Sequence, residues 1–268
     1  MNDEQEHASE PAKPPFYQRP WYQGIGAVVA LLTAVWALVG APKPWDAIGD
    51  IFSSELPANN AEIVFDASEE MNRPFDQPGT NLSKLEAASD AVRTYGSPIS
   101  NEGLALRRVG DSCSEPGPRL VDFGADHGDD VADVAAEQRA RGESNLAATV
   151  IAAIDDFADS DRFPDPDAQK QVVIFAGTTD ECQTQANRRI REKLEEADIE
   201  ADFELIGVRL SPADQAELRR LKMALGGKNV DVHFASTTTE MEEAAVIAAK
   251  KVSGTTGGTP TVGGPVGD

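Results

Sequence analysis

The chain has 268 residues, of which 46 are acidic and 24 basic, and its formal net charge is −22. Hydrophobic residues make up 40% of the chain, which excludes a fully disordered protein. The excess of negative charge argues against a nucleic-acid partner, because a phosphate backbone would be repelled.

Composition changes along the chain and predicts five regions. We expect a disordered polar tail over 1–20, a transmembrane helix over 21–45, a linker over 46–60, a folded domain over 61–252 and a disordered Gly/Thr/Pro tail over 253–268. Only the fourth region alternates apolar runs with amphipathic stretches, so the fold is expected there.

The prediction of a membrane helix rests on residues 24–41, which carry no charge. As a helix this run extends about 27 Å, close to the ~30 Å of a hydrocarbon core. Trp21 and Trp45 flank it, as interfacial aromatic residues do. A buried core helix and a cleavable signal peptide are the alternatives. The long polar stretch before the run favours an uncleaved anchor.

Basic residues and cysteines predict the side of the membrane. Lys13 and Arg19 precede the apolar run, and only Lys43 follows it closely. The positive-inside rule then predicts a single-pass protein of the cell membrane, with a cytoplasmic N-terminus and an extracytoplasmic domain. Cys113 and Cys182 are isolated, and two such cysteines in an exported domain would be expected to pair. In a cytosolic domain they would instead be two free thiols.

Hydrophobic periodicity predicts the elements of the folded region in chain order. We expect strands over 61–66, 102–109, 119–123, 171–176, 202–208 and 230–235. We expect helices after Asn81, over 130–140, over 146–157, around Ile190 and Leu194, from Ser211 to Gly226, and from a Thr239–Glu242 capping box to Lys250 and Lys251. This order predicts an α/β fold: a doubly wound, mostly parallel six-stranded sheet with one antiparallel edge strand and helices on both faces.

The first predicted strand runs into the stretch VFDASEEM, residues 64–71. This stretch resembles the D-x-S-x-S motif that opens von Willebrand factor A (vWA) domains. The runs ARGESNLAATVIAAIDDF and QVVIFAGTTDEC are similar to two later loops of that family. The resemblance extends from Ala61 to Val252 and includes the order of strands and helices. It implies a vWA/Rossmann-like fold and a role in protein–protein interaction, in adhesion or assembly.

The resemblance also implies a cation site. In the family, an Asp and two Ser of the first loop, a Thr of the second and an Asp of the third hold a divalent cation. Asp66 and Ser68 match, whereas Glu70 and Ser144 stand where the second serine and the threonine belong. Gly177 stands where the third-loop aspartate belongs. The candidate ligands of this degenerate site, for Mg²⁺ or another divalent cation, are therefore Asp66, Ser68, Glu70, Ser144 and, three residues past Gly177, Asp180.

Plainer roles remain open for the same residues. Asp66 and Ser68 are also suited to bonding the backbone of their own loop. Ser144 or Asn145 is a suitable N-cap for the helix that follows. The family resemblance implies a disulfide as well, since several bacterial members place cysteines as Cys113 and Cys182 are placed here.

Catalytic motifs are absent from the sequence. It has three histidines but no Ser-His-Asp order, no HExxH and no P-loop, so we expect no enzyme. The sequence thus predicts a membrane-anchored extracytoplasmic module that binds an unidentified protein partner. The alternative is a metal-independent structural subunit of an envelope or membrane complex.

Overall fold

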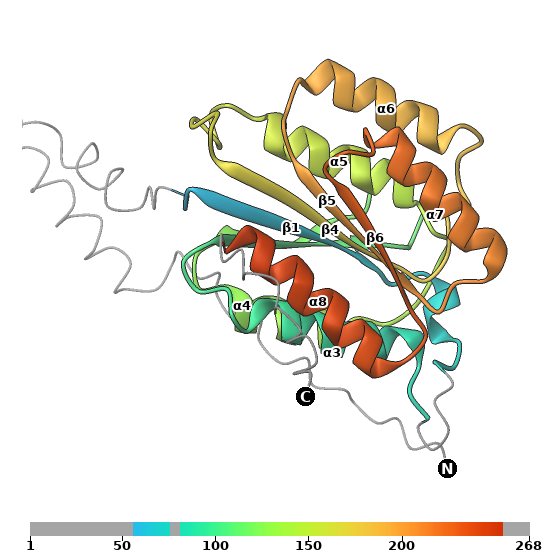
Figure 1. Cartoon of the computed structure of the whole chain (residues 1–268). Coiled ribbons are helices and arrows are strands. Elements are labelled where there is room, and N and C mark those ends of the chain that lie inside the picture. Colours follow the sequence, from blue (N-terminus) through green and yellow to red (C-terminus); the bar gives the residue numbers. More distant parts are fainter. Residues whose placement is uncertain (1–55, 76–80, 254–268) are drawn as a thin grey trace, which may run out of the picture. The chain divides into compact units, whose positions relative to one another are not determined.

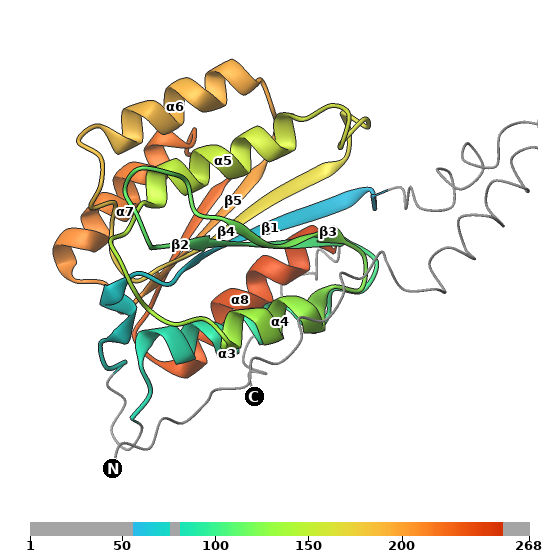
Figure 2. The same cartoon turned by 180° about the vertical axis from the view of Figure 1, so that it is seen from behind.

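The computed structural model describes residues 56–75 and 81–253. In this part of the chain, a six-stranded sheet lies between two layers of helices (Figure 1, Figure 2). The strands are β1 (Asn59–Asp66), β2 (Gly103–Val109), β3 (Arg119–Gly124), β4 (Gln169–Ala176), β5 (Asp202–Val208) and β6 (Val230–Ala235). The helices are the 3₁₀ helix η2 (Glu69–Asn72), α3 (Lys84–Gly96), α4 (Gly128–Ala136), α5 (Leu146–Ala158), α6 (Ala186–Ala197), α7 (Pro212–Ala224) and α8 (Thr238–Val252).

The sheet order is β3-β2-β1-β4-β5-β6. Every neighbouring pair is parallel except β2 and β3, which are antiparallel. The predicted α/β class, with a mostly parallel sheet and one antiparallel edge strand, is therefore confirmed. Helices α3, α4 and α8 cover one face of the sheet, and α5, α6 and α7 cover the other (Figure 1).

Strand β1 lies inside the sheet and is buried on both faces. Its side chains alternate between the faces because the period of a strand is two residues. Ile63 and Phe65 pack into the apolar cluster beneath α3 and α8, whereas Val64 packs into the cluster beneath α5. A strand covered on both sides needs a nearly continuous apolar run, which the sequence provides here.

Hydrogen-bonding side chains define where several helices begin. Ser83 and Glu86 form a capping box at α3. At α7 the Ser211 side chain accepts from the backbone of Asp214, at the predicted start of that helix. The capping box predicted at Thr239 and Glu242 is wrong by two residues. Thr237 and Glu240 form it instead. Three consecutive threonines permit either register, and the chain turns into the helix almost directly after β6 ends.

A buried ion-pair network lies between β1 and α5. Glu62 is fully buried, and Arg107 Nε donates to its Oε1 at 2.8 Å. Asp156 of α5 forms ion pairs with Arg107 and Arg119. Burial raises the pKa of Glu62 to about 7, although Arg107 opposes the shift. Asp156 is thus held within this network, whereas its neighbour Asp155 is half exposed.

The predicted transmembrane helix over 21–45 lies outside the described residues, as do both predicted tails apart from Ser253. Within 56–75 and 81–253, none of the helices has the length and apolar character needed to cross a bilayer.

Candidate functional site

The candidate site lies at the carboxyl ends of the parallel strands, where ligands bind in open sheets of this kind. We call this surface the upper face; it consists of the loops 67–75, 110–118, 137–145 and 177–185. Backbone hydrogen bonds join these loops. Ala67 N donates to Val109 O at 2.9 Å, Glu69 N to Gly142 O at 2.8 Å, and Glu181 N to Ser144 O at 2.9 Å.

Asp66, the last residue of β1, is buried at the centre of the upper face. Its Oδ1 accepts from Ser68 N at 2.9 Å, and its Oδ2 accepts from Gly177 N at 2.8 Å. Burial raises the pKa of Asp66, while hydrogen bonds from the loops after β1 and β4 oppose the rise. The carboxyl group thus holds two loops together, as the turn interpretation expects.

Ser68 and Ser144 are fully buried. The Ser68 hydroxyl is close enough to Asp66 to lower its pKa, yet neither serine hydroxyl has a well-formed hydrogen bond among the described residues. A buried hydroxyl without a partner costs about 1–3 kcal/mol, and such groups usually meet water or a ligand. The hydroxyl oxygens of these two serines are therefore available to bond a water molecule or a ligand.

Glu70 is paired with cations that the protein itself provides. Lys84 Nζ lies 3.0 Å from Glu70 Oε1, and Arg73 Nε lies 2.8 Å from Glu70 Oε2. Lys84 is buried and also donates to the carbonyl oxygen of Gly177 at 2.9 Å. Sequence reasoning did not identify Lys84, because a lysine that opens a helix is normally expected in solvent.

The position of Gly177 has no room for the aspartate of the family motif. A Cβ atom there would collide with the sulfur of Met71 and would lie 3.4 Å from Asp66 Oδ2. Met71 is fully buried in η2, so its side chain fills the space that a larger residue at 177 would need.

Asp180 is engaged with backbone groups. Its Oδ2 accepts from Ala147 N at 2.6 Å, near the start of α5. Its Oδ1 accepts from Cys182 N at 3.0 Å and from Gln183 N at 2.7 Å. The carboxylate therefore caps α5 and shapes the loop after β4, and its oxygens are already used.

Asn145 occupies the N-cap position of α5 but makes no side-chain capping bond. Its Oδ1 accepts from Gly110 N at 3.0 Å, and its Nδ2 donates to Ser112 O at 3.0 Å and to Glu115 O at 2.6 Å. This buried amide fixes the loop after β2 to the start of α5. The sequence indicates a helix start here but contains no signal for the long-range role.

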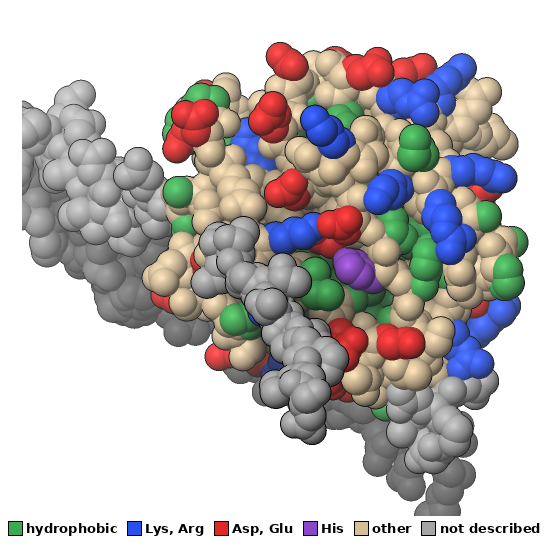
Figure 3. Space-filling view, viewed as in Figure 1, with side chains coloured by type: hydrophobic (Ala, Val, Ile, Leu, Met, Phe, Trp, Pro, Cys, Tyr) green, Lys and Arg blue, Asp and Glu red, His purple; other side chains and the backbone are tan. Residues whose placement is uncertain are grey.

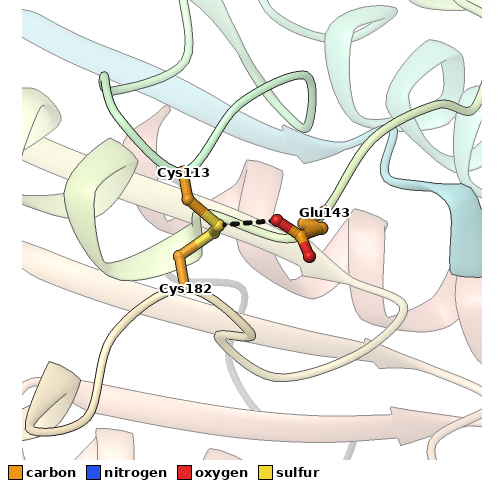
Figure 4. A group of neighbouring side chains, drawn as sticks. All are labelled: Cys113, Glu143 and Cys182. Carbon is orange, nitrogen blue, oxygen red and sulfur yellow. Dashed lines mark hydrogen bonds between the residues drawn. A yellow bond between two sulfur atoms is a disulfide. The ribbon is translucent and has the colours of Figure 1, made fainter.

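The disulfide between Cys113 and Cys182 is confirmed, with a Cα–Cα distance of 5.1 Å. Glu143 Oε2 lies 3.0 Å from Cys113 Sγ, so the carboxylate lies beside the bridge (Figure 4). Within 56–75 and 81–253, these three side chains form the only group of His, Cys, Asp or Glu residues arranged closely enough to hold a metal ion. As a disulfide, the sulfurs are not thiolates and therefore do not act as ligands.

A hollow of about 690 Å³ opens on the upper face. Its lining includes four glutamates and one arginine, and we call it the acidic hollow: Glu69, Glu70, Asn72, Arg73, Pro74, Gly142, Glu143 and Glu181. Glu69, Glu143 and Glu181 are exposed, and none of them forms an ion pair with another described residue. Elsewhere the surface charge is mixed, as the view over α6, α7 and α8 shows (Figure 3).

The sequence matches no protein-family profile and no curated protein sequence. Solved structures do share the fold. A variant of the PilB minor pilin from Streptococcus sanguinis aligns with a TM-score of 0.58 and 11% identity, over 72% of this chain and 61% of that one. A von Willebrand factor type A protein from Catenulispora acidiphila aligns with a TM-score of 0.54 and 18% identity, over 72% of this chain and 42% of that one.

A variant of an aerotolerance-related membrane protein from Bacteroides fragilis also has this fold. It aligns with a TM-score of 0.52 and 10% identity, over 72% of this chain and 99% of that one. The chain therefore spans about three-fifths of the pilin and about two-fifths of the Catenulispora protein. At these identities the likeness concerns the fold alone, and the fold is vWA-like.

Proposed function

We propose that the domain is a protein-interaction module that binds a protein partner through its upper face, in adhesion or assembly. The observation that carries this proposal is the upper face of a vWA-like fold, whose loops are joined by hydrogen bonds around the buried Asp66. A minor pilin and a von Willebrand factor type A protein are among the structures that share the fold. Neither described histidine bonds to Asp66: His127 bonds the backbone of Asp122, and His233 bonds Glu204. An interaction role therefore accounts for the site better than catalysis does.

The proposed module is anchored in the cell membrane by residues 21–45, with its N-terminus in the cytoplasm and its folded domain outside. The disulfide supports an oxidising compartment. The described chain enters the sheet at Asn59, the end of β1 opposite to Asp66.

The proposed interaction does not depend on a divalent cation. Three oxygen-bearing side chains remain at the motif positions: Asp66, Ser68 and Ser144. Among them only Asp66 is ionisable, and burial raises its pKa, whereas the Glu70 carboxylate is paired with Lys84 and Arg73. Asp180 is bound to backbone amides, and Gly177 contributes no side chain. A hard cation such as Mg²⁺ favours charged oxygen ligands, so this set does not fit it.

Photo-crosslinking from two positions tests the interaction. A photoreactive residue replaces Asn72 on the upper face, and in a matched variant it replaces Asp167, which is exposed at the opposite end of the sheet. We expect a discrete covalent complex in intact membranes from position 72 and none from position 167. Equal labelling from both positions, or none from either, would contradict the proposal.

Thermal unfolding of the full chain with EDTA and with Mg²⁺, Mn²⁺ or Ca²⁺ tests the metal statement. A cation that binds only the folded state raises the melting temperature in a saturable way. We expect no such rise at millimolar concentrations. A saturable rise that disappears in Asp66→Asn would show that the site is functional and would restore metal-dependent binding.

A further inference from the structure

The acidic hollow holds carboxylates that have no internal counter-charge. Glu70 is neutralised by Lys84 and Arg73, but Glu69, Glu143 and Glu181 are exposed and form no ion pair within the described part of the chain. The hollow also belongs to a protein with a net charge of −22. Arg73 also lines the hollow but is paired with Glu70, so the unpaired charges of the lining are negative. A concave surface with an excess of one sign of charge attracts groups of the opposite sign. The occupant it favours is therefore cationic.

The spacing of the carboxylates favours an organic cation over a metal ion. A metal ion needs ligand atoms that converge on one point, and among the described residues only the group containing the disulfide does so. The glutamates instead surround about 690 Å³ of space. A hollow of that size accommodates a side chain that enters from another molecule.

Two oxygen atoms beside the hollow also lack donors. Ser68 directly precedes Glu69 in the sequence, and Ser144 directly follows Glu143. The buried hydroxyls of both serines have no well-formed hydrogen bond among the described residues. Lysine and arginine side chains carry only hydrogen-bond donors. The carboxylates that line the hollow are the acceptors that such a side chain requires, whereas the two hydroxyls are fully buried and do not line it.

The hollow is already formed in the free protein. The disulfide joins the loop after β2 to the loop that carries Glu181. Glu181 also exchanges two hydrogen bonds with Ser144, the neighbour of Glu143. Glu69 N is bonded to Gly142 O at 2.8 Å. A preorganised hollow loses little conformational freedom on binding, which favours recognition of a single inserted group.

We propose that the protein partner presents a lysine or arginine side chain that inserts into the acidic hollow. This inference rests on the proposed function and names the chemistry of the partner.

The test uses the full chain in nanodiscs of neutral lipid and two fluorescent peptides. One peptide carries four arginines in a Gly/Ser background, and the other carries four glutamates at the same positions. The double variant Glu69→Gln, Glu143→Gln removes two charges from the hollow. The control Glu195→Gln, Glu200→Gln removes two exposed charges that lie outside it. Fluorescence anisotropy at low and physiological salt gives the dissociation constants.

We expect the arginine peptide to bind the wild type, and its affinity to fall about tenfold in the hollow variant and less than about twofold in the control. Higher salt should weaken binding, since the hollow is open to solvent. Equal losses of affinity in both variants would mean that the peptide responds only to the overall charge of the protein, and would overturn the inference. Tighter binding of the glutamate peptide would also overturn it.

Combining the hollow variant with the crosslinker at position 72 separates the two proposals. A complex that forms in the wild type and weakens in the hollow variant supports both of them. A complex that is unaffected by Glu69→Gln, Glu143→Gln leaves the proposed function standing and overturns the cationic contact. Absence of any complex overturns the proposed function itself.

Discussion

The buried Lys84 and the partly exposed Glu70 form a cation–carboxylate contact, with 3.0 Å between Nζ and Oε1, beside the strand end that carries Asp66. The same ammonium group donates to the carbonyl oxygen of Gly177. The Lys84 ammonium group thus links the loop after β1 to the loop after β4. In the metal-site motif that the sequence resembles, a bound cation would join the corresponding loops.

Replacing Lys84 with methionine tests this role. The change leaves Gly177 O without its donor and Glu70 with Arg73 alone, so we expect unfolding free energy to fall by about 2–3 kcal/mol. Glu70→Gln should cost less, because Glu70 is partly exposed and its amide can still accept from Lys84. Urea unfolding of both variants and the double variant measures the coupling, which should be about 1 kcal/mol. Strict additivity would show that the contact stabilises nothing.

Glu62 predicts a dependence of stability on pH. Burial raises its pKa from the ordinary 4.5 to about 7, so the folded state prefers the protonated form. This contribution to stability is complete below pH 4.5 and is lost as the pH rises through about 7. Over that interval the unfolding free energy should fall by about 3 kcal/mol more in the wild type than in Glu62→Gln, which cannot titrate there.

Denaturant unfolding between about pH 3 and 8 checks the sign. Glu86→Gln is a control whose effect on stability should have the opposite pH dependence, because hydrogen bonds from Ser83 lower the pKa of Glu86. Its contribution is lost as the pH falls. Parallel pH profiles for the wild type and Glu62→Gln would mean that Glu62 remains ionised beside Arg107 throughout.

Much of the fold is predictable because its signals are local. The apolar run 171–176 reports a strand buried on both faces, and Ser211 with Asp214 reports a helix start. The register of the last helix was predicted wrongly because Thr237 and Thr239 present equivalent local patterns. Local signals therefore predict that an element exists more reliably than where it begins.

The site is less predictable because its contacts are long-range. Asp66 and Ser68 stand in a recognisable motif, so the sequence indicates them. Lys84 contacts a carbonyl 93 positions away, and Asn145 bonds the backbone 35 positions away. Only the folded sheet brings those groups together, and no periodicity or spacing encodes the pairing.

Removal of the disulfide should lower stability without changing the fold. The Cys113→Ser, Cys182→Ser variant frees a loop closed over 69 positions, and we expect a loss of about 2–5 kcal/mol. Dithiothreitol should lower the melting temperature of the wild type and leave that of the double variant unchanged. An identical response of the two proteins would mean that the bridge does not form in the purified chain.

Truncation of the buried hydroxyls of the upper face should change stability much less than truncation of its buried amide. Ser68→Ala and Ser144→Ala remove oxygens that have no partner among the described residues, so stability should stay within about 1 kcal/mol of the wild type. Asn145→Ala removes three hydrogen bonds to the loop after β2 and should cost about 2–4 kcal/mol. Urea unfolding of the three variants under one set of conditions gives the comparison. A serine variant as unstable as Asn145→Ala would mean that its hydroxyl holds a bound group in the free protein, and the upper face would then contain a permanent ligand.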